Sequence, residues 1–180
     1  MNKDIELVGE RILLRPYRLD DIDGMYEAIC ESIPEISRWM DWCHPDYKRE
    51  ESETWIKSRD EAWEQGVAYP FAILDKKTGA HVGGCGISFI NKEYLFANLG
   101  YWVGTPHTKQ GIATAATRLL ADWAFRELKL NRIEIVAAVG NKASQRVAAR
   151  AGAKREGVLR NRLMLHKKPV DAVMFSLIPS

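Results

Sequence analysis

The sequence has few cysteines and no long apolar run. These two shortages argue against a disulfide-stabilised secreted protein and against a membrane-spanning protein. Cys30, Cys43 and Cys85 are an odd number at wide spacing and form no Cys-x-x-Cys pair, which favours reduced thiols in a cytoplasmic protein. His44 beside Cys43 has no second ligand pair at a suitable spacing, so no metal site is predicted. No stretch of 18 or more apolar residues occurs and the N-terminus mixes charges, so neither a membrane span nor a signal peptide is expected.

The sequence also lacks an excess of charge of one sign. The 26 Lys and Arg residues stand against 24 Asp and Glu, a net charge of +2 that gives no strong attraction to nucleic acid or membranes. The densest basic group lies between Arg155 and Lys168 and includes Leu159, Leu163 and Leu165. We interpret this group as a solvated strand face, with nucleic-acid binding as the alternative.

Repeats, low-complexity tracts and linkers are absent as well. The 180 residues are 46% hydrophobic and 28% charged, which is ordinary for a globular protein with a substantial core. We therefore predict one domain over residues 1–180.

The hydrophobic pattern predicts a mixed sheet with helices on both faces. Strands are expected over 9–16, 69–74, 82–90, 95–103 and 132–139, with two further strands at the end of the chain. Helices are expected from Asp20-Asp21 to Ile29, over 50–65 with Gly66 as the stop, over 110–128, and over 142–151 with Gly152 as the C-cap; Pro34 opens a short helical or looped stretch. This order fits an α+β arrangement better than an alternating doubly wound fold.

A glycine at the start of the 110–128 helix indicates a phosphate site. A strand ends at Val103, a turn follows, and Gly111 and Ala113 leave the first helical amides free of bulk. The helix dipole and Lys109 add positive charge there. The spacing matches neither a P-loop nor a Rossmann fingerprint, and a tight turn without a ligand is the alternative.

Several motifs in order along the chain resemble those of the GNAT acetyltransferase superfamily, in the branch of the RimJ/RimL-type ribosomal-protein N-terminal acetyltransferases. They lie at 9–16, 20–21, 39–42, 100–103, 111–115, 141–144, 150–153 and 170–172. The resemblance implies a GNAT fold, with a mixed and mostly antiparallel central sheet of about seven strands flanked by helices on both faces.

The resemblance further implies acetyl-CoA as co-substrate. The residues carried over for the pyrophosphate are Thr108, Lys109, Gln110, Gly111, Ile112, Ala113 and Thr114, with Thr108 standing where the family has Arg or Gln. Tyr101, Trp102 and Val103 would pair their backbone with the pantetheine arm as an added strand. Asn141 would bind the pantetheine from the start of the next helix.

The proton-transfer groups depart from the family at two positions. Asn98 stands where many relatives have a glutamate base, and Ala148 where they have a tyrosine that protonates the thiolate. Ser144 resembles the serine that serves the leaving sulfur in the RimL-like branch; alternatively it caps the helix or contacts CoA. Asp41 and Glu93 are candidate bases, and for each the alternative is a solvated acid.

The acceptor side is predicted around two tryptophans. Trp39 and Trp42 resemble the wall of the family's acceptor site, with core packing as the alternative, and Asn98 is expected beside them. We expect direct acetyl transfer in a ternary complex to a primary amine, with the N-terminus of a ribosomal protein as the leading acceptor. A small amine and a non-catalytic acyl-CoA-binding module are the alternatives, and a homodimer is left open.

Overall fold

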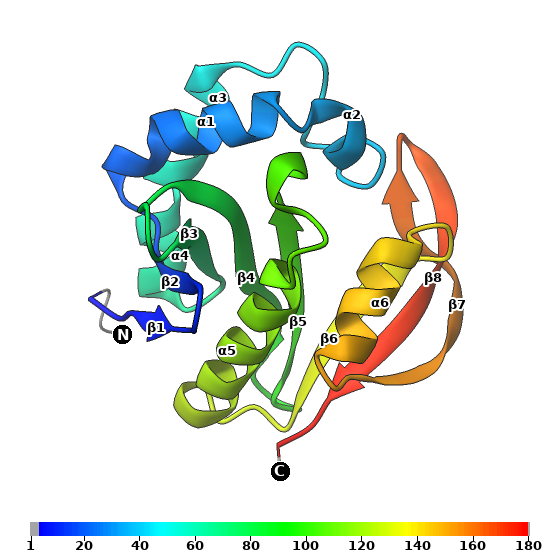
Figure 1. The fold of residues 1–180 in the computed structure, drawn as a ribbon. Coiled ribbons are helices and arrows are strands. Elements are labelled where there is room, and N and C mark those ends of the chain that lie inside the picture. Colours follow the sequence, from blue (N-terminus) through cyan, green and yellow to red (C-terminus); the bar gives the residue numbers. More distant parts are fainter. Residues whose placement is uncertain (1–3, 180) are drawn as a thin grey trace.

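The computed structural model describes residues 4–179, and within them eight strands form one open sheet (Figure 1). The strands are β1 (Leu7–Val8), β2 (Ile12–Pro16), β3 (Tyr69–Asp75), β4 (His81–Asn91), β5 (Phe96–Val103), β6 (Arg132–Ala138), β7 (Lys154–Leu165) and β8 (Lys168–Leu177). The predicted mixed sheet is confirmed, with one strand more than the seven expected. The additional strand is β1, whose two residues pair with Leu13 and Leu14 and are too few to produce an alternating pattern.

The sheet is divided where β5 meets β6. The strand order is β1-β2-β3-β4-β5-β6-β8-β7, and every neighbouring pair is antiparallel except β5 and β6. These two parallel strands pair only through residues 96–98 and 132–134. Beyond that point β5 continues along β4 and β6 continues along β8, so the two strands diverge.

Helices lie on both faces of this sheet. They are α1 (Ile22–Cys30), α2 (Ile33–Ile36), α3 (Arg49–Lys57), α4 (Arg59–Gln65), α5 (Ile112–Glu127) and α6 (Lys142–Arg150), with 3₁₀ turns at Leu19–Asp21 and Thr105–His107. No helix of residues 4–179 combines the length and apolar character needed to cross a bilayer. The prediction of a single domain over residues 1–180 stays a prediction, and residues 1–3 and 180 lie outside the described part.

Two predicted helix boundaries are wrong. The helix expected over 50–65 is interrupted at Ser58, where the Ser58 hydroxyl and the Arg59 Nε both donate to the Trp55 carbonyl, at 2.7 and 3.0 Å. Side chains that bond to a helix carbonyl compete with the backbone ladder. The helix expected from residue 110 begins at Ile112, because Gly111 before it has φ +83° and caps the helix from the left-handed region.

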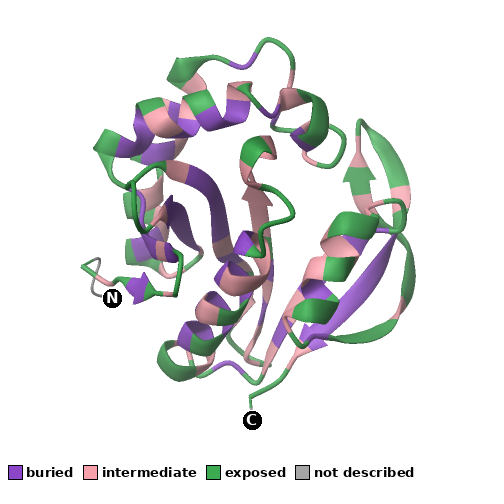
Figure 2. Cartoon of the chain, viewed as in Figure 1, coloured by how far each residue is buried: buried purple, intermediate pink, exposed green. Residues whose placement is uncertain are grey.

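The core consists of two hydrophobic clusters, one on each face of the sheet. The larger contains the inner side of α5 and also Trp63 of α4, and its Trp123 packs edge-on against Phe71 with ring centroids 5.1 Å apart. The smaller lies beneath α1 and α3 and includes Ile29 and Ile56. Figure 2 shows that burial is concentrated in the strands, whereas β7 is largely exposed, which agrees with the solvated strand face predicted for residues 155–168.

A half-buried histidine beneath α1, whose two ring nitrogens are shielded from solvent, should make stability depend on pH. Neither ring nitrogen of His81 has a partner among the described residues, and burial lowers the pKa of His81 to about 4, from about 6.5 in the unfolded chain. Between pH 4 and pH 6.5 the unfolded chain binds more protons than the folded chain. The free energy of unfolding is therefore highest above about pH 6.5 and falls by roughly 3 kcal/mol as the pH drops to 4. Urea unfolding of the wild type and of His81→Gln at pH 7 and pH 5 measures this. The substitution should flatten the pH dependence, and an equal loss of stability from pH 7 to pH 5 in the two proteins would contradict this assignment.

Candidate active site

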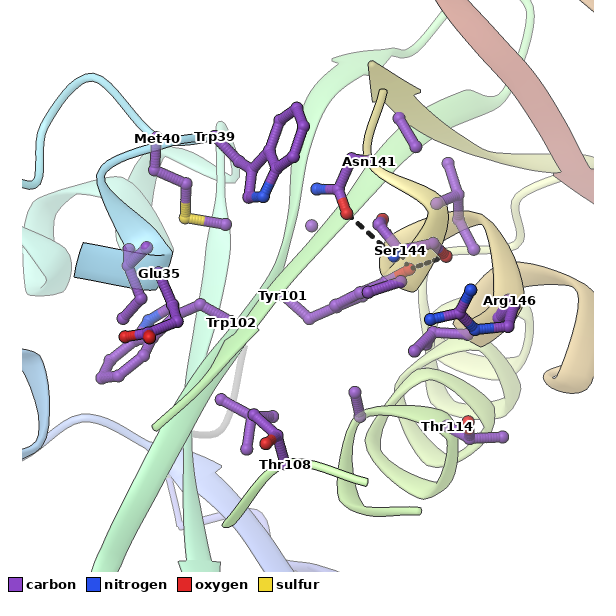
Figure 3. Close-up of a pocket in the computed structure, with 18 of the residues that line it drawn as sticks. Glu35, Trp39, Met40, Tyr101, Trp102, Thr108, Thr114, Asn141, Ser144 and Arg146 are labelled. Carbon is purple, nitrogen blue, oxygen red and sulfur yellow. Dashed lines mark hydrogen bonds between the residues drawn. The ribbon is translucent and has the colours of Figure 1, made fainter. Parts of the chain in front are cut away.

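A cavity of about 780 Å³ opens where β5 and β6 diverge (Figure 3). Its lining includes residues 99–103 of β5, residues 135–138 of β6, and residues from α2, α5 and α6. The divergence follows from the short β5–β6 ladder, which leaves the facing edge of β5 without a strand partner beyond Asn98. A ligand can therefore enter between the two strands and use backbone groups of β5.

At one end of the cavity the turn before α5 presents backbone amides. Gly111 accepts from the Ala115 amide through its carbonyl, and an added Cβ at Gly111 would meet no atom within 4 Å. Glycine is therefore favoured at position 111 by its positive φ and not by lack of space, and the surface above it is open to a ligand. The Thr108 hydroxyl is bound to the Thr105 carbonyl at 2.9 Å, which holds the turn in shape.

The charge of the lining is strongly unbalanced. Side chains that carry or can take positive charge come from the segment after α2, from the turn before α5 and from α6, and they are Arg38, His107, Lys109, Arg146 and Arg150. Among the described lining residues, Glu35 is the only carboxylate. Helix amides and several cations in one cavity match an anionic ligand of phosphate type.

A tyrosine from β5 contacts the first turn of α6. The Tyr101 hydroxyl donates to the Ser144 carbonyl at 3.0 Å and lies 3.1 Å from the Ser144 Oγ (Figure 3). Burial raises the pKa of Tyr101 to about 12, so the phenol keeps its proton at neutral pH. Ala148, where many relatives have a tyrosine, is fully buried, and the phenol beside Ser144 comes from another element.

Asn141 acts as the N-cap of α6. Its side-chain oxygen accepts from the Ser144 amide at 3.0 Å, which satisfies one of the unpaired donors of the first turn. The cap therefore belongs to Asn141, and the Ser144 hydroxyl is directed to Tyr101. Asn141 and Ser144 both line the cavity, so the structure brings them together with Tyr101.

Most of the residues predicted to hold the cofactor line this cavity. Those that do are Tyr101, Trp102, Val103, Thr108, Lys109, Gly111, Ile112, Ala113, Thr114, Asn141 and Ser144. The exception is Gln110, whose side chain donates to the Pro106 carbonyl at 3.1 Å and accepts from Arg11 at 3.2 Å. The role of each residue towards a ligand stays a prediction.

The two predicted tryptophans are exposed, and one of them, Trp39, lies at the other end of the cavity. Trp39 and Trp42 are 36% and 42% exposed, so core packing does not describe them. Trp39 lines the cavity, and its ring lies so close to Gly140 that an added Cβ there would stand 3.2 Å from it. Trp42 is outside the lining and packs edge-on against Trp102, with ring centroids 6.1 Å apart.

The predicted proton-transfer residues on the acceptor side are more scattered. Asp41 lies outside the lining, and its Oδ1 accepts from the His166 amide at 2.9 Å. Asn98 closes the β5–β6 ladder, one residue before the lining begins. Glu93 is exposed in the turn before β5, at the end of the strand far from Val103. The assignment of either acid as base stays a prediction.

Glu35 was missed by the sequence reasoning. It is exposed on α2, lines the cavity, and accepts from the Thr105 hydroxyl at 3.0 Å. Ser32, fully buried one turn earlier, accepts from the Thr105 amide at 2.8 Å, so the start of α2 is fastened to the turn after β5. The spacing of Glu35 and Trp39, one helical turn apart, was the signal that could have revealed it.

Comparisons with known proteins agree with this geometry. Residues 11–154 match the acetyltransferase (GNAT) domain family. A protein of Bacillus licheniformis named uncharacterized N-acetyltransferase p20 is 31% identical over 96% of this chain and 95% of its own. A solved structure of a putative ribosomal-protein-serine acetyltransferase from Vibrio cholerae is 32% identical, has a TM-score of 0.88, and is covered over 99% of this chain and all of that one.

A more distant structure shares the fold. It is RimL, a ribosomal L7/L12 α-N-protein acetyltransferase in complex with coenzyme A, which is 20% identical with a TM-score of 0.88 over 97% of this chain and 98% of its own. Among residues 4–179 no group of His, Cys, Asp or Glu is placed to hold a metal ion. The family match spans most of the chain, so this protein belongs to the GNAT family in its RimJ/RimL-like branch and is an acetyl-CoA-dependent N-acetyltransferase.

Proposed function

We propose that this enzyme acetylates the N-terminal α-amine of a polypeptide, by direct attack of the amine on acetyl-CoA in a ternary complex. A ribosomal protein is the leading acceptor, and it would place the reaction in the cytoplasm. The observation that carries the proposal is the cavity between β5 and β6, which is cationic at the α5 end and lined by Trp39 at the α2 end. The name of the Vibrio cholerae relative supports a ribosomal acceptor.

The residues present fit an acetyl-CoA molecule lying between the strands. The first amides of α5 and the side chain of Lys109 would hold the pyrophosphate, and Arg146 adds charge from α6. The free edge of β5 at Tyr101–Val103 would pair with the amides of the pantetheine arm. The thioester would then reach the region of Tyr101 and Ser144.

The reaction requires two proton transfers, one from the amine nitrogen and one to the leaving sulfur. The neutral amine attacks the thioester carbonyl, a C–N bond forms, and the nitrogen gives up one proton to water. The C–S bond breaks, and the sulfur leaves as a thiolate. The Ser144 hydroxyl would give its proton to this thiolate and regain one from water. The Tyr101 hydroxyl, which stays protonated, would stabilise the Ser144 Oγ in the interval by turning its one hydrogen bond from the Ser144 carbonyl to this oxygen, 3.1 Å away.

On the acceptor side Glu35 would bind the incoming ammonium. An α-amine has an unperturbed pKa near 8, so roughly a tenth or more is neutral at pH 7 without a strong base, whereas a Lys amine near 10.4 is mostly protonated. The single negative charge of Glu35 can balance one ammonium group on the acceptor. A polycation such as a polyamine or an aminoglycoside would call for more acidic groups than the single Glu35 in the described lining.

Glu35→Gln should raise the KM for a peptide acceptor about tenfold and leave the KM for acetyl-CoA unchanged. The amide keeps the shape and can still accept from Thr105, so the loss reports the missing charge. Steady-state kinetics with each substrate varied in turn measure this. An unchanged KM for the peptide would contradict the role of Glu35. Asp41→Asn is the companion variant: if its pH–rate profile loses an ionisation that Glu35→Gln retains, Asp41 is the base.

One assay tests the proposed function as a whole. The protein is incubated with acetyl-CoA and a panel of N-terminal peptides, polyamines, amino acids and aminoglycosides, and thiol release and product mass are followed. We expect mass addition at the α-amine of peptides. Turnover confined to a small amine would replace the proposal, and donor binding without turnover on any amine would favour a non-catalytic acyl-CoA-binding module.

A further inference from the structure

The densest basic segment of the chain is not explained by the acetyl-CoA site. Four exposed cations lie towards the tip of the β7–β8 hairpin: Arg160 and Arg162 in β7, Lys167 in the turn, and Lys168 at the start of β8. None of them forms an ion pair with another described residue. By contrast Glu156, the acid of the same strand, is bound to Arg132 at 2.5 Å. Four unpaired cations on one hairpin form a local positive field, even though the net charge of the whole chain is only +2.

The tip of this hairpin stands at the acceptor end of the cavity. The His166 amide donates to Asp41, close in sequence to Trp39, and Leu163 lines the cavity itself. Figure 1 shows the end of the β7–β8 hairpin next to α2, at the same end of the molecule. Arg162 and Lys167 directly adjoin Leu163 and His166 in sequence, so the backbone at both cations lies at this end of the molecule, beside the cavity rather than in its lining.

Two features leave the hairpin available to a partner. β7 is the last strand of the sheet and pairs only with β8, so its outer backbone edge is unpaired within the described chain. The nearby carboxylates are already engaged with backbone amides: Asp41 accepts from His166, and Asp171 accepts from Asn161 at 2.9 Å. Four cations against two carboxylates leave the hairpin with an excess of positive charge.

We propose that the β7–β8 hairpin binds an acidic stretch of the acceptor polypeptide, a few residues after the N-terminus that is acetylated. The inference rests on the proposed function, because only a polypeptide acceptor extends out of the cavity. A chain that enters between Trp39 and Leu163 must leave across the hairpin tip, where acidic side chains meet Arg162 and Lys167. The partner class is therefore a protein whose N-terminal segment carries Asp or Glu.

The test uses peptides that share their first three residues and continue with an acidic, a neutral or a basic tail. The wild type should show a KM for the acidic peptide about tenfold below that for the neutral one, and highest for the basic one, since several exposed pairs each add a small gain. The kcat should be similar for all three. At 1 M salt the preference should disappear, because charges are then screened over about 3 Å.

A charge reversal at the hairpin has a matched control on the same strand. Arg162→Glu/Lys167→Glu should abolish or invert the preference, whereas Lys154→Glu/Arg155→Glu makes the same change in net charge at the other end of β7 and should preserve it. Thermal unfolding and acetyl-CoA KM verify that both variants fold. Equal KM values for the three peptides, or equal loss in both variants, would overturn the inference.

A failure of the proposed function is distinguishable from a failure of the hairpin. If no peptide is acetylated, fluorescence anisotropy of the labelled acidic peptide still reports on the surface: binding that Arg162→Glu/Lys167→Glu removes supports the inference, and no binding refutes it. If the wild type instead ignores all peptide tails and binds an RNA oligonucleotide through these cations, the surface is a nucleic-acid site and the inference is wrong.

Discussion

Gly111→Asp should raise the KM for acetyl-CoA about a hundredfold, whereas the isosteric Gly111→Asn should raise it only a few-fold. A carboxylate at the start of α5 would face the pyrophosphate, and two charges roughly 4 Å apart near a protein surface repel by about 4 kcal/mol. Nothing lies within 4 Å of the position that a Cβ would take, so both side chains fit, and Asn and Asp tolerate the left-handed backbone of Gly111. Initial rates over a range of acetyl-CoA concentrations measure the effect.

Comparing the two variants separates the effect of a negative charge at position 111 on the KM for acetyl-CoA from the effect of a larger side chain. Both carry the same backbone strain, so the ratio of their KM values isolates the electrostatic contribution to binding. The kcat at saturating acetyl-CoA should change little in either variant. Equal KM values for Asp and Asn would mean that the amides at the start of α5 hold no anion, and the placement of the pyrophosphate there would have to be abandoned.

Ser144→Ala should lower kcat about a hundredfold while the KM for acetyl-CoA stays within a few-fold of the wild type. A positioned general acid contributes on the order of 10²–10⁴ to a rate, and the substitution removes the hydroxyl that lies 3.1 Å from the Tyr101 hydroxyl. The cap of α6 is retained, because Asn141 accepts from the backbone amide of residue 144 and not from its side chain. Single-turnover rates at saturating substrates measure the chemical step directly.

Tyr101→Phe is the companion of that experiment. It keeps the ring that packs in the cavity and removes one hydrogen-bond donor, so we expect a roughly tenfold lower kcat and a smaller loss than in Ser144→Ala. The double variant should lose little more than Ser144→Ala alone, since Tyr101 acts through Ser144. Losses that simply multiply would show that the two hydroxyls act independently, and a full rate in Ser144→Ala would reduce Ser144 to a CoA contact.

The sequence predicted those helices and strands that are long enough to show a regular hydrophobic pattern within their own residues. Ile112, Leu120 and Trp123 stand at helical spacing in the predicted helix over 110–128, and all three are buried in α5. β1 was missed because two residues cannot show alternation, and the break at Ser58 depends on a hydrogen bond to Trp55 that no periodicity reveals. Local hydrogen bonding overrides an otherwise continuous helical pattern there.

The same distinction applies to the site. Its cofactor half was predictable because residues 101–103 and 108–114 are contiguous and the strand–turn–helix order presents them together. The proposed acceptor half is assembled from α2, the loop after it and the hairpin tip, which are far apart in sequence. The spacing of Glu35 and Trp39 indicates Glu35, but no sequence pattern joins Leu163 to them, because only the divergence of β5 and β6 brings these residues to one cavity.

The short ladder between β5 and β6 also has a mechanical consequence. Three residues of each strand join strands β1–β5 to strands β6–β8, so the two parts of the sheet are held together mainly by side-chain packing around α5. Such a seam is where a sheet opens most readily in sub-global fluctuations. Acetyl-CoA bound along β5 would contact both parts of the sheet. Donor binding should therefore stabilise the seam and make the two parts unfold as one cooperative unit.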